Sequence, residues 1–184
     1  MKIDSKYAIV VAHPDDEVLF ASSIISKVSK IIICYGEIPE KNMKAQSLGR
    51  FKIQKKYPFE NVVFLNIKQL IKYRRKKINF NISNKNYNEV NFNNYKKAYE
   101  RNTSKFINLL SVHLKGIDRV YTHSPWGEYG HEDHKQIFGC IMNLKKINKF
   151  KIFVFGYISR NTINSAYKNF KLLNGEIIIK KNNF

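Results

Sequence analysis

Two short stretches of this chain bring histidine and carboxylate side chains close together. One has the sequence AHPDDE and ends at Glu17, and the other has the sequence GHEDH and ends at His134. Imidazole nitrogens and carboxylate oxygens are ligands that zinc and similar divalent cations accept. Each stretch alone has a plainer explanation, because acids often precede a helix and a His-x-x-His pair is a weak signal. Their positions in the predicted fold therefore matter.

The first stretch follows a predicted strand. Residues 6–12 are rich in β-branched and apolar side chains, which predicts a strand buried on both faces. A proline after the first histidine ends this strand, because proline cannot donate to a ladder. Apolar residues at helical spacing over 18–28 then predict a helix. His13, Asp15 and Asp16 thus lie at a strand's carboxyl end, where ligands bind in open parallel sheets.

The remaining elements alternate between strand and helix. Strands are predicted over 30–35, 61–66, 118–122 and 150–157, and helices over 40–57, over 95–114 and from about His131. This alternation predicts an α/β fold, a single-domain Rossmann-like sheet of about five parallel strands with helices on both faces. In the order 3-2-1-4-5, the first and fourth strands are neighbours where the order reverses. The two histidine stretches would then open onto one crevice.

We expect residues 1–184 to form one domain, because no linker or internal repeat divides them. Asparagine and lysine crowd residues 68–94, which predicts an irregular insertion. Residues 158–184 form a C-terminal extension, in which Asn174-Gly175 predicts a hairpin turn between 170–173 and 177–179.

The charge of the chain leaves a second class of function open. It has 33 basic and 14 acidic residues, for a net charge of +19. Such a field favours polyanions, although an AT-rich genome produces the same excess of lysine, asparagine and isoleucine. The alternative function is therefore a basic nucleic-acid or anionic-membrane binding protein with a non-catalytic metal site. Steep salt dependence of binding would support it.

The remaining composition bears on compartment and assembly. Cys34 and Cys140 provide no disulfide framework and lie in apolar contexts that predict buried free thiols. The start lacks a signal-peptide pattern, and no apolar run reaches the ~18 residues of a membrane span. We expect a cytoplasmic protein, with peripheral attachment to an anionic membrane and homo-oligomerisation both open.

The two motifs together resemble those of a known enzyme family. AHPDDE at 12–17 and GHEDH at 130–134, each after a strand, are similar to the motifs of the PIG-L/LmbE-like zinc-dependent N-acetylglucosamine de-N-acetylases. The resemblance covers about residues 7–157 and is weak over 68–94. It implies a hydrolase that removes the acetyl group from an N-acetylglucosamine-type sugar. The sugar could be phosphorylated, nucleotide-linked or lipid-linked, and nucleic acid is then not expected as a partner.

The resemblance also implies roles for individual residues. It makes His13, Asp16 and His134 the metal ligands and Asp15 the general base. Three protein ligands leave zinc an open position for water, and Fe²⁺ or Co²⁺ accepts the same donors. His131 becomes a residue that stabilises the transition state, oriented by Asp133, and Tyr129 lies on a loop over the substrate carbonyl.

Substrate contacts are predicted from residues near the motifs. The candidates are Arg50, His123, Trp126 and Glu128. Relatives carry an Arg-x-x-Glu pattern in the helix before the third strand, where this chain has Gln46 and Gly49 with Arg50 one step away. Sugar recognition is therefore expected to differ from that of relatives.

Overall fold

A six-stranded parallel sheet forms the centre of the fold. The computed structural model describes residues 6–39, 43–70, 96–157, 163 and 177–180. The strands are β1 (Tyr7–Val11), β2 (Lys30–Tyr35), β3 (Val62–Ile67), β4 (Arg119–Thr122), β5 (Lys151–Phe155) and β6 (Ile177–Lys180). Their order is β3-β2-β1-β4-β5-β6, and every neighbouring pair is parallel. The predicted α/β class and the order 3-2-1-4-5 are confirmed.

The central strands are buried on both faces. In β1, Ala8 and Val10 point into one apolar cluster and Ile9 and Val11 into the other. This alternation is the two-residue period of a strand, and both sets are apolar because both faces are covered.

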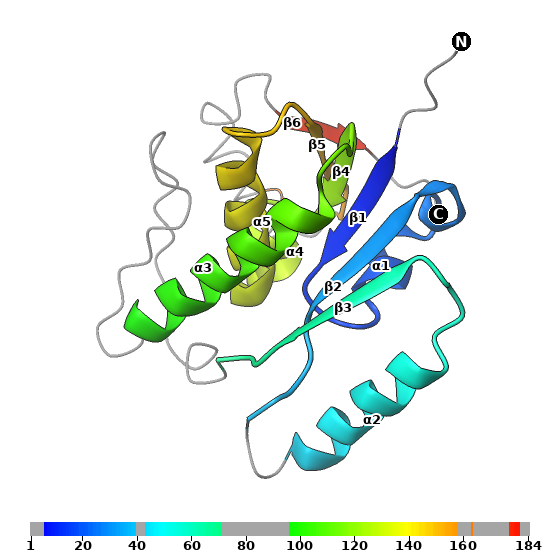
Figure 1. Cartoon of the computed structure of the whole chain (residues 1–184), viewed down its shortest axis with the longest axis vertical. Helices are drawn as coiled ribbons and strands as arrows, with labels where there is room; N and C mark the ends of the chain where they lie inside the picture. The colour runs from blue at the N-terminus through cyan, green and yellow to red at the C-terminus, as the bar shows by residue number, and fades with distance from the viewer. Residues whose placement is uncertain (1–5, 40–42, 71–95, 158–162, 164–176, 181–184) are drawn as a thin grey trace.

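One face is covered by two long helices that lie side by side (Figure 1). These are α3 (Lys96–His113) and α5 (Glu132–Lys145). Phe106 and Leu110 of α3, and Leu114 just after it, are buried in the same cluster as Ile137 and Cys140 of α5. Both helices form where the sequence predicts them, at 95–114 and from about His131.

The opposite face is covered by shorter elements. They include α1 (Asp16–Ala21) and the 3₁₀ turn η1 (Ile25–Lys27), while α2 (Lys44–Lys55) lies toward the β3 edge (Figure 1). The prediction of one helix over 18–28 was wrong, because α1 ends at Ala21 and the chain turns before η1. Val18 and Leu19 of α1 are exposed.

The C-terminal part adds a strand that the sequence did not predict in this form. Residues 177–180 pair parallel with β5 as β6, and the predicted hairpin with 170–173 stays a prediction. Residues 170–175 and 71–94 lie outside the described residues, and a single domain over 1–184 stays a prediction. Cys34 and Cys140 are free and buried, as expected. Within the described part of the chain, no helix is both long and apolar enough to cross a membrane.

Candidate metal centre

The two histidine stretches meet at the carboxyl ends of β1 and β4. These strands are hydrogen-bonded neighbours, with Val10 paired to Thr122. The loop after β1 leads into α1, and the loop after β4 passes through the single turn α4 (Gly127–Gly130) into α5. The rings of His13 and His134, 121 positions apart in the sequence, have centroids 5.4 Å apart. The predicted crevice is therefore formed.

Asp16 lies between these two imidazoles. Its Oδ2 atom is 3.2 Å from His13 Nδ1 and 3.5 Å from His134 Nε2. The same oxygen accepts a hydrogen bond of 2.8 Å from the backbone N–H of His13. Burial opposes ionisation, but the neighbouring imidazoles of His123, His13 and His134 hold the pKa of Asp16 well below its ordinary value. The carboxylate at the centre of the site is therefore charged.

His13 is held from its far side by a second buried carboxylate. Its Nε2 atom lies 2.9 Å from Asp133 Oδ2, so a proton on Nε2 is donated to Asp133 and Nδ1 keeps its lone pair. Nδ1 is the atom that faces Asp16. This arrangement of carboxylate, imidazole and open lone pair is typical of histidines that ligate metals.

His134 is held in the same way by another carboxylate. Its Nδ1 atom lies 2.7 Å from Glu128 Oε2, which leaves the lone pair on Nε2. That Nε2 atom is buried and has no hydrogen-bond partner among the described residues. Burial opposes the charge of Glu128, but the neighbouring His123 and His134 lower its pKa to about 2. A buried nitrogen without a partner, beside an ionised Asp16, is a position that a cation would satisfy.

The ligand atoms fit one divalent cation. Two groups of donor atoms each lie within 4.8 Å of one another: His13, His131 and His134, and Asp16, His123 and His134. The nitrogens of His123 are both engaged, because Nε2 accepts from the Ala12 N–H at 2.9 Å and Nδ1 lies 3.0 Å from Glu128. The three predicted ligands occur in these groups: His134 in both, His13 in the first and Asp16 in the second.

Asp15 occupies a strained position beside these donors. Its φ of 116° is rare for a residue with a side chain, and such strain is concentrated at functional sites. The backbone N–H of Asp15 donates to Glu17 Oε2 at 3.1 Å, and the hydroxyl of Tyr57 donates to the other oxygen of Glu17. Partial burial of its carboxyl and the charge of Asp16 raise the pKa of Asp15. Asp15 itself is exposed.

A glutamine that the sequence did not single out completes the far side of the site. Gln69 is buried, and its Nε2 atom donates to Asp133 Oδ2 at 2.6 Å. Gln69 Oε1 accepts from Arg50 Nη1 at 3.0 Å, and this bond sets the orientation of the amide. The Nε2 atoms of Gln69 and His13 lie 2.7 Å apart, and both contact the same oxygen of Asp133. Arg50, Gln69 and Asp133 thus form a chain of hydrogen bonds behind His13.

Comparison with known protein families identifies the family of this chain. The family of GlcNAc-PI de-N-acetylases, PIG-L, matches residues 8–145, which is three quarters of the chain. This chain belongs to the PIG-L family. Both histidine stretches, the strands β2, β3 and β4, and all of β1 except Tyr7 lie inside the match. A curated relative, "Uncharacterized protein L374" of Acanthamoeba polyphaga mimivirus, is 29% identical over 181 residues, covering 94% of this chain and 73% of that protein.

Two further residues named from the PIG-L resemblance lie next to the ligand atoms. His131 stacks on His134 with centroids 4.4 Å apart, and its Nδ1 atom accepts from the backbone N–H of Asp133 at 3.3 Å. This bond places the His131 proton on Nε2. Tyr129 is half-exposed, with its ring 5.9 Å from that of His131 and 5.7 Å from that of His134. The carboxylate of Asp133, expected to orient His131, binds His13 and Gln69 instead.

The four predicted substrate contacts are less accessible than expected. His123 and Glu128 are buried and bonded to each other, so they hold the site from within. Arg50 is buried and also donates to the carbonyl of Gly36 at 3.1 Å. Trp126 is buried, and its Nε1 atom has no partner among the described residues. The structure therefore does not bring these side chains to the open side, where Asp15 and Tyr129 lie.

Proposed function

We propose that this chain is a metal-dependent hydrolase that removes the acetyl group from an N-acetylated amino sugar of the N-acetylglucosamine type. One observation carries the proposal: the two histidines, each bonded at the far nitrogen to a buried carboxylate, direct their other nitrogens at Asp16. Membership of a de-N-acetylase family agrees with it.

His13, Asp16 and His134 would hold the cation, for which zinc is our proposal and Fe²⁺ or Co²⁺ fits the same donors. When bound, such a cation polarises the amide carbonyl and lowers the pKa of a water molecule toward neutrality. Three protein donors leave room for that water and for the substrate. Asp133 and Glu128 fix the two imidazoles in the tautomers that this role requires.

The remaining residues supply proton transfer and stabilisation of charge. Asp15 lies next to the ligands without being needed as one, so it can take a proton from the attacking water and pass it to the leaving amine. His131, with its proton on Nε2, and the hydroxyl of Tyr129 are donors for the oxyanion that develops from the acetyl carbonyl. Removing such a donor costs about 10²–10³ in rate in other enzymes.

The substrate's sugar is proposed to carry phosphate. The net charge of +19 favours an anionic ligand over a neutral one. A free sugar phosphate, a nucleotide sugar and a lipid-linked sugar share this chemistry, and the matching family is described by a lipid-linked substrate, GlcNAc-PI. Whether the active form is a homo-oligomer stays a prediction.

The test separates metal binding from chemistry with a pair of isosteric substitutions. Asp15→Asn should retain the wild-type metal content and lose about 10²–10⁴ in the rate of acetate release, because only the proton acceptor is removed. Asp16→Asn should lose both the metal and the activity. Metal is measured by elemental analysis, and acetate release is measured with N-acetylglucosamine and its phosphate ester.

Asp118→Asn provides the matched control, since this residue bonds to the Lys6 N–H at the amino ends of β1 and β4, whereas the site lies at their carboxyl ends. It should behave as wild type. Full activity in Asp15→Asn, or wild-type protein that binds no metal and releases no acetate, contradicts the proposal. The second result would leave the basic binding protein as the better hypothesis.

A further inference from the structure

The helix α2 is amphipathic in the reverse sense. Its buried side chains are polar, Ser47 and Arg50. Its apolar side chains point outward, with Leu48 60%, Phe51 40% and Ile53 49% exposed. A surface helix ordinarily presents its apolar stripe to the core. The packing of this chain therefore does not account for the large apolar residues of α2.

The inward polar contacts explain why α2 is held in this orientation. Ser47 Oγ bonds to both the N–H and the carbonyl of Ile38, at 2.9 and 3.1 Å. Arg50 Nη1 donates to Gly36 and to Gln69, as described above. Burying Leu48 or Phe51 by rotating the helix would break these bonds and leave the buried partners unpaired, which is costly. The outward apolar face is thus imposed by the fold.

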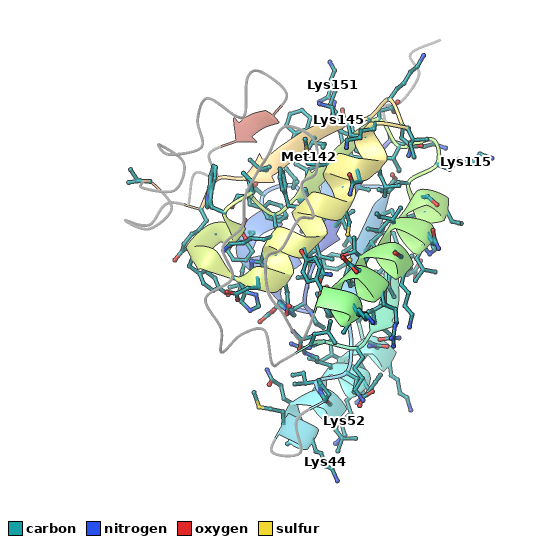
Figure 2. The ribbon with its side chains drawn as sticks, turned by 90° about the vertical axis from the view of Figure 1, so that its left-hand side faces the viewer. Lys44, Lys52, Lys115, Met142, Lys145 and Lys151 are labelled. Carbon is teal, nitrogen blue, oxygen red and sulfur yellow. The ribbon has the colours of Figure 1, made fainter. Side chains whose placement is uncertain are left out.

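The outward face combines these apolar residues with lysines. Lys44, Leu48, Phe51 and Lys55 recur at intervals of four, three and four residues, so they lie along one stripe of the helix, and Lys52 follows Leu48 by one turn. The helix contains no aspartate or glutamate. Figure 2 shows Lys44 and Lys52 at the end of the molecule that α2 forms, with Lys115 and Lys151 toward the other end.

We propose that this stripe docks the protein on an anionic lipid surface. Basic side chains attract the acidic headgroups, while Leu48 and Phe51 enter the boundary between headgroups and acyl chains. Long lysine side chains can lie along that boundary with their ammonium groups in water. The proposal does not depend on the hydrolase activity.

Other occupants fit the stripe less well. A second copy related by a two-fold axis would place Lys44, Lys52 and Lys55 against their own equivalents, and like charges at an interface oppose association. Phosphate backbones of nucleic acid pair with lysines but give no role to two exposed aliphatic and aromatic residues on a convex helix. An acidic lipid surface is the partner that uses both sets of side chains.

Docking there would bring the candidate metal centre close to the lipid. Arg50 leaves the inner side of α2 and bonds to Gln69, which bonds to Asp133 beside His13. This chain of hydrogen bonds connects the inner side of α2 to His13.

The experiment measures co-sedimentation of the full chain with vesicles. One set contains phosphatidylcholine alone, and the other contains phosphatidylcholine mixed with phosphatidylserine. Wild type should bind the mixed vesicles and not the neutral ones, and binding should weaken as salt is raised. Leu48→Ser with Phe51→Ser should lower the partition coefficient at least about tenfold.

Matched controls separate binding by the stripe from the effect of net charge and from non-specific hydrophobic adsorption. Val112→Ser with Ile147→Ser removes two apolar residues elsewhere that are more exposed than Leu48 and Phe51, and it should leave binding unchanged. Replacing Lys44, Lys52 and Lys55 by glutamine should lower partitioning about a hundredfold, since each lysine near the surface contributes about fivefold. The same replacement of Lys115, Lys149 and Lys151 removes equal charge elsewhere and should have a much smaller effect.

Three results would overturn the proposal. The first is wild-type protein that does not co-sediment with the mixed vesicles. The second is equal loss in the two lysine variants, which would make binding a matter of net charge. The third is a concentration-dependent dimer, seen by sedimentation velocity, that Leu48→Ser with Phe51→Ser dissociates while vesicle binding persists. All substituted residues are exposed, so circular dichroism should show unchanged folding.

Discussion

Both imidazoles that face Asp16 have their proton positions set by a carboxylate on the other side of the ring. Asp133 binds Nε2 of His13, whereas Glu128 binds Nδ1 of His134. The two histidines therefore offer different nitrogens, Nδ1 and Nε2, to the same point. Partners of this kind orient the ring and raise its basicity, and losing them typically costs 10–100-fold in affinity or activity.

The hydrogen bonds behind His13 extend this argument to Gln69. Gln69→Leu removes the amide that donates to Asp133 and leaves Arg50 without one acceptor. We expect about a 10–100-fold weaker affinity for zinc, measured by competition with a chromophoric chelator, and a matching fall in kcat/KM for acetate release.

Gln54→Leu is the control for this change, because Gln54 of α2 makes a solvent-exposed hydrogen bond with Asn66 of β3. It should leave both measurements unchanged. If Gln69→Leu instead raised KM alone with zinc affinity intact, Gln69 would act on the substrate rather than on His13. Restoration of affinity by Gln69→Asn is not expected, since the shorter side chain does not span Arg50 and Asp133.

Residue types and spacing were sufficient to name donor residues that the fold brings together, but not the residues that hold them in place. His13, Asp16 and His134 lie in two local motifs, and the structure brings all three together. Gln69 lies 56 positions from His13 with no pattern around it, so only the tertiary fold connects them. Glu128 was named as a substrate contact, but its φ of 55° turns the side chain inward, and a backbone angle of that kind is not visible in the sequence.

At the scale of elements, α3 is attached to the sheet through a narrow apolar stripe. Leu110 is fully buried, whereas its neighbour Leu109 is 40% exposed. Leu110→Ala should lower the free energy of unfolding by about 2–5 kcal/mol, measured by urea denaturation. Leu109→Ala removes the same atoms from the solvent side and should cost less than about 1 kcal/mol.

Equal losses of unfolding free energy in the two variants would contradict the observed orientation of α3, with Leu110 facing the sheet and Leu109 facing solvent. The orientation of α3 also affects the site. Phe106 of α3 packs edge-on against Tyr35, with ring centroids 5.0 Å apart, and Tyr35 stacks on His13 with centroids 5.7 Å apart. Leu110→Ala is therefore expected to reduce activity only if the lost packing also displaces the Tyr35 ring from His13.

The strands and long helices were predictable because their signals are local and strong. Runs such as Ile31–Cys34 are apolar throughout, and only a strand covered on both faces buries such a run. The helix after β1 was not predictable to its end, because the apolar spacing continues through η1 although the backbone has already turned. The parallel pairing of β6 with β5 joins strands that are separated in the sequence, and a local turn signal at 174–175 does not predict such a pairing.

For the whole molecule, the candidate cation links two parts of the chain that only the fold brings together. His13 and Asp16 follow β1, and His134 belongs to α5, more than a hundred residues later. Three donors, one of them the charged Asp16, would join these parts when the cation binds. A ligand that binds the folded chain and not the unfolded chain stabilises it by about 2.7 kcal/mol at a free concentration of 100 Kd.

Metal removal should therefore lower the thermal midpoint of unfolding. For a chain of this length the expected difference between zinc-loaded and chelator-treated protein is about 5–10 °C, measured by calorimetry. The Asp16→Asn variant lacks the central donor, so its midpoint should be the same with and without zinc. An equal zinc-dependent rise in both proteins would place the stabilising ion elsewhere. A rise in neither would mean that the geometry around Asp16 does not hold a cation, and the hydrolase would then lose its chemical basis even though the fold remains that of the family.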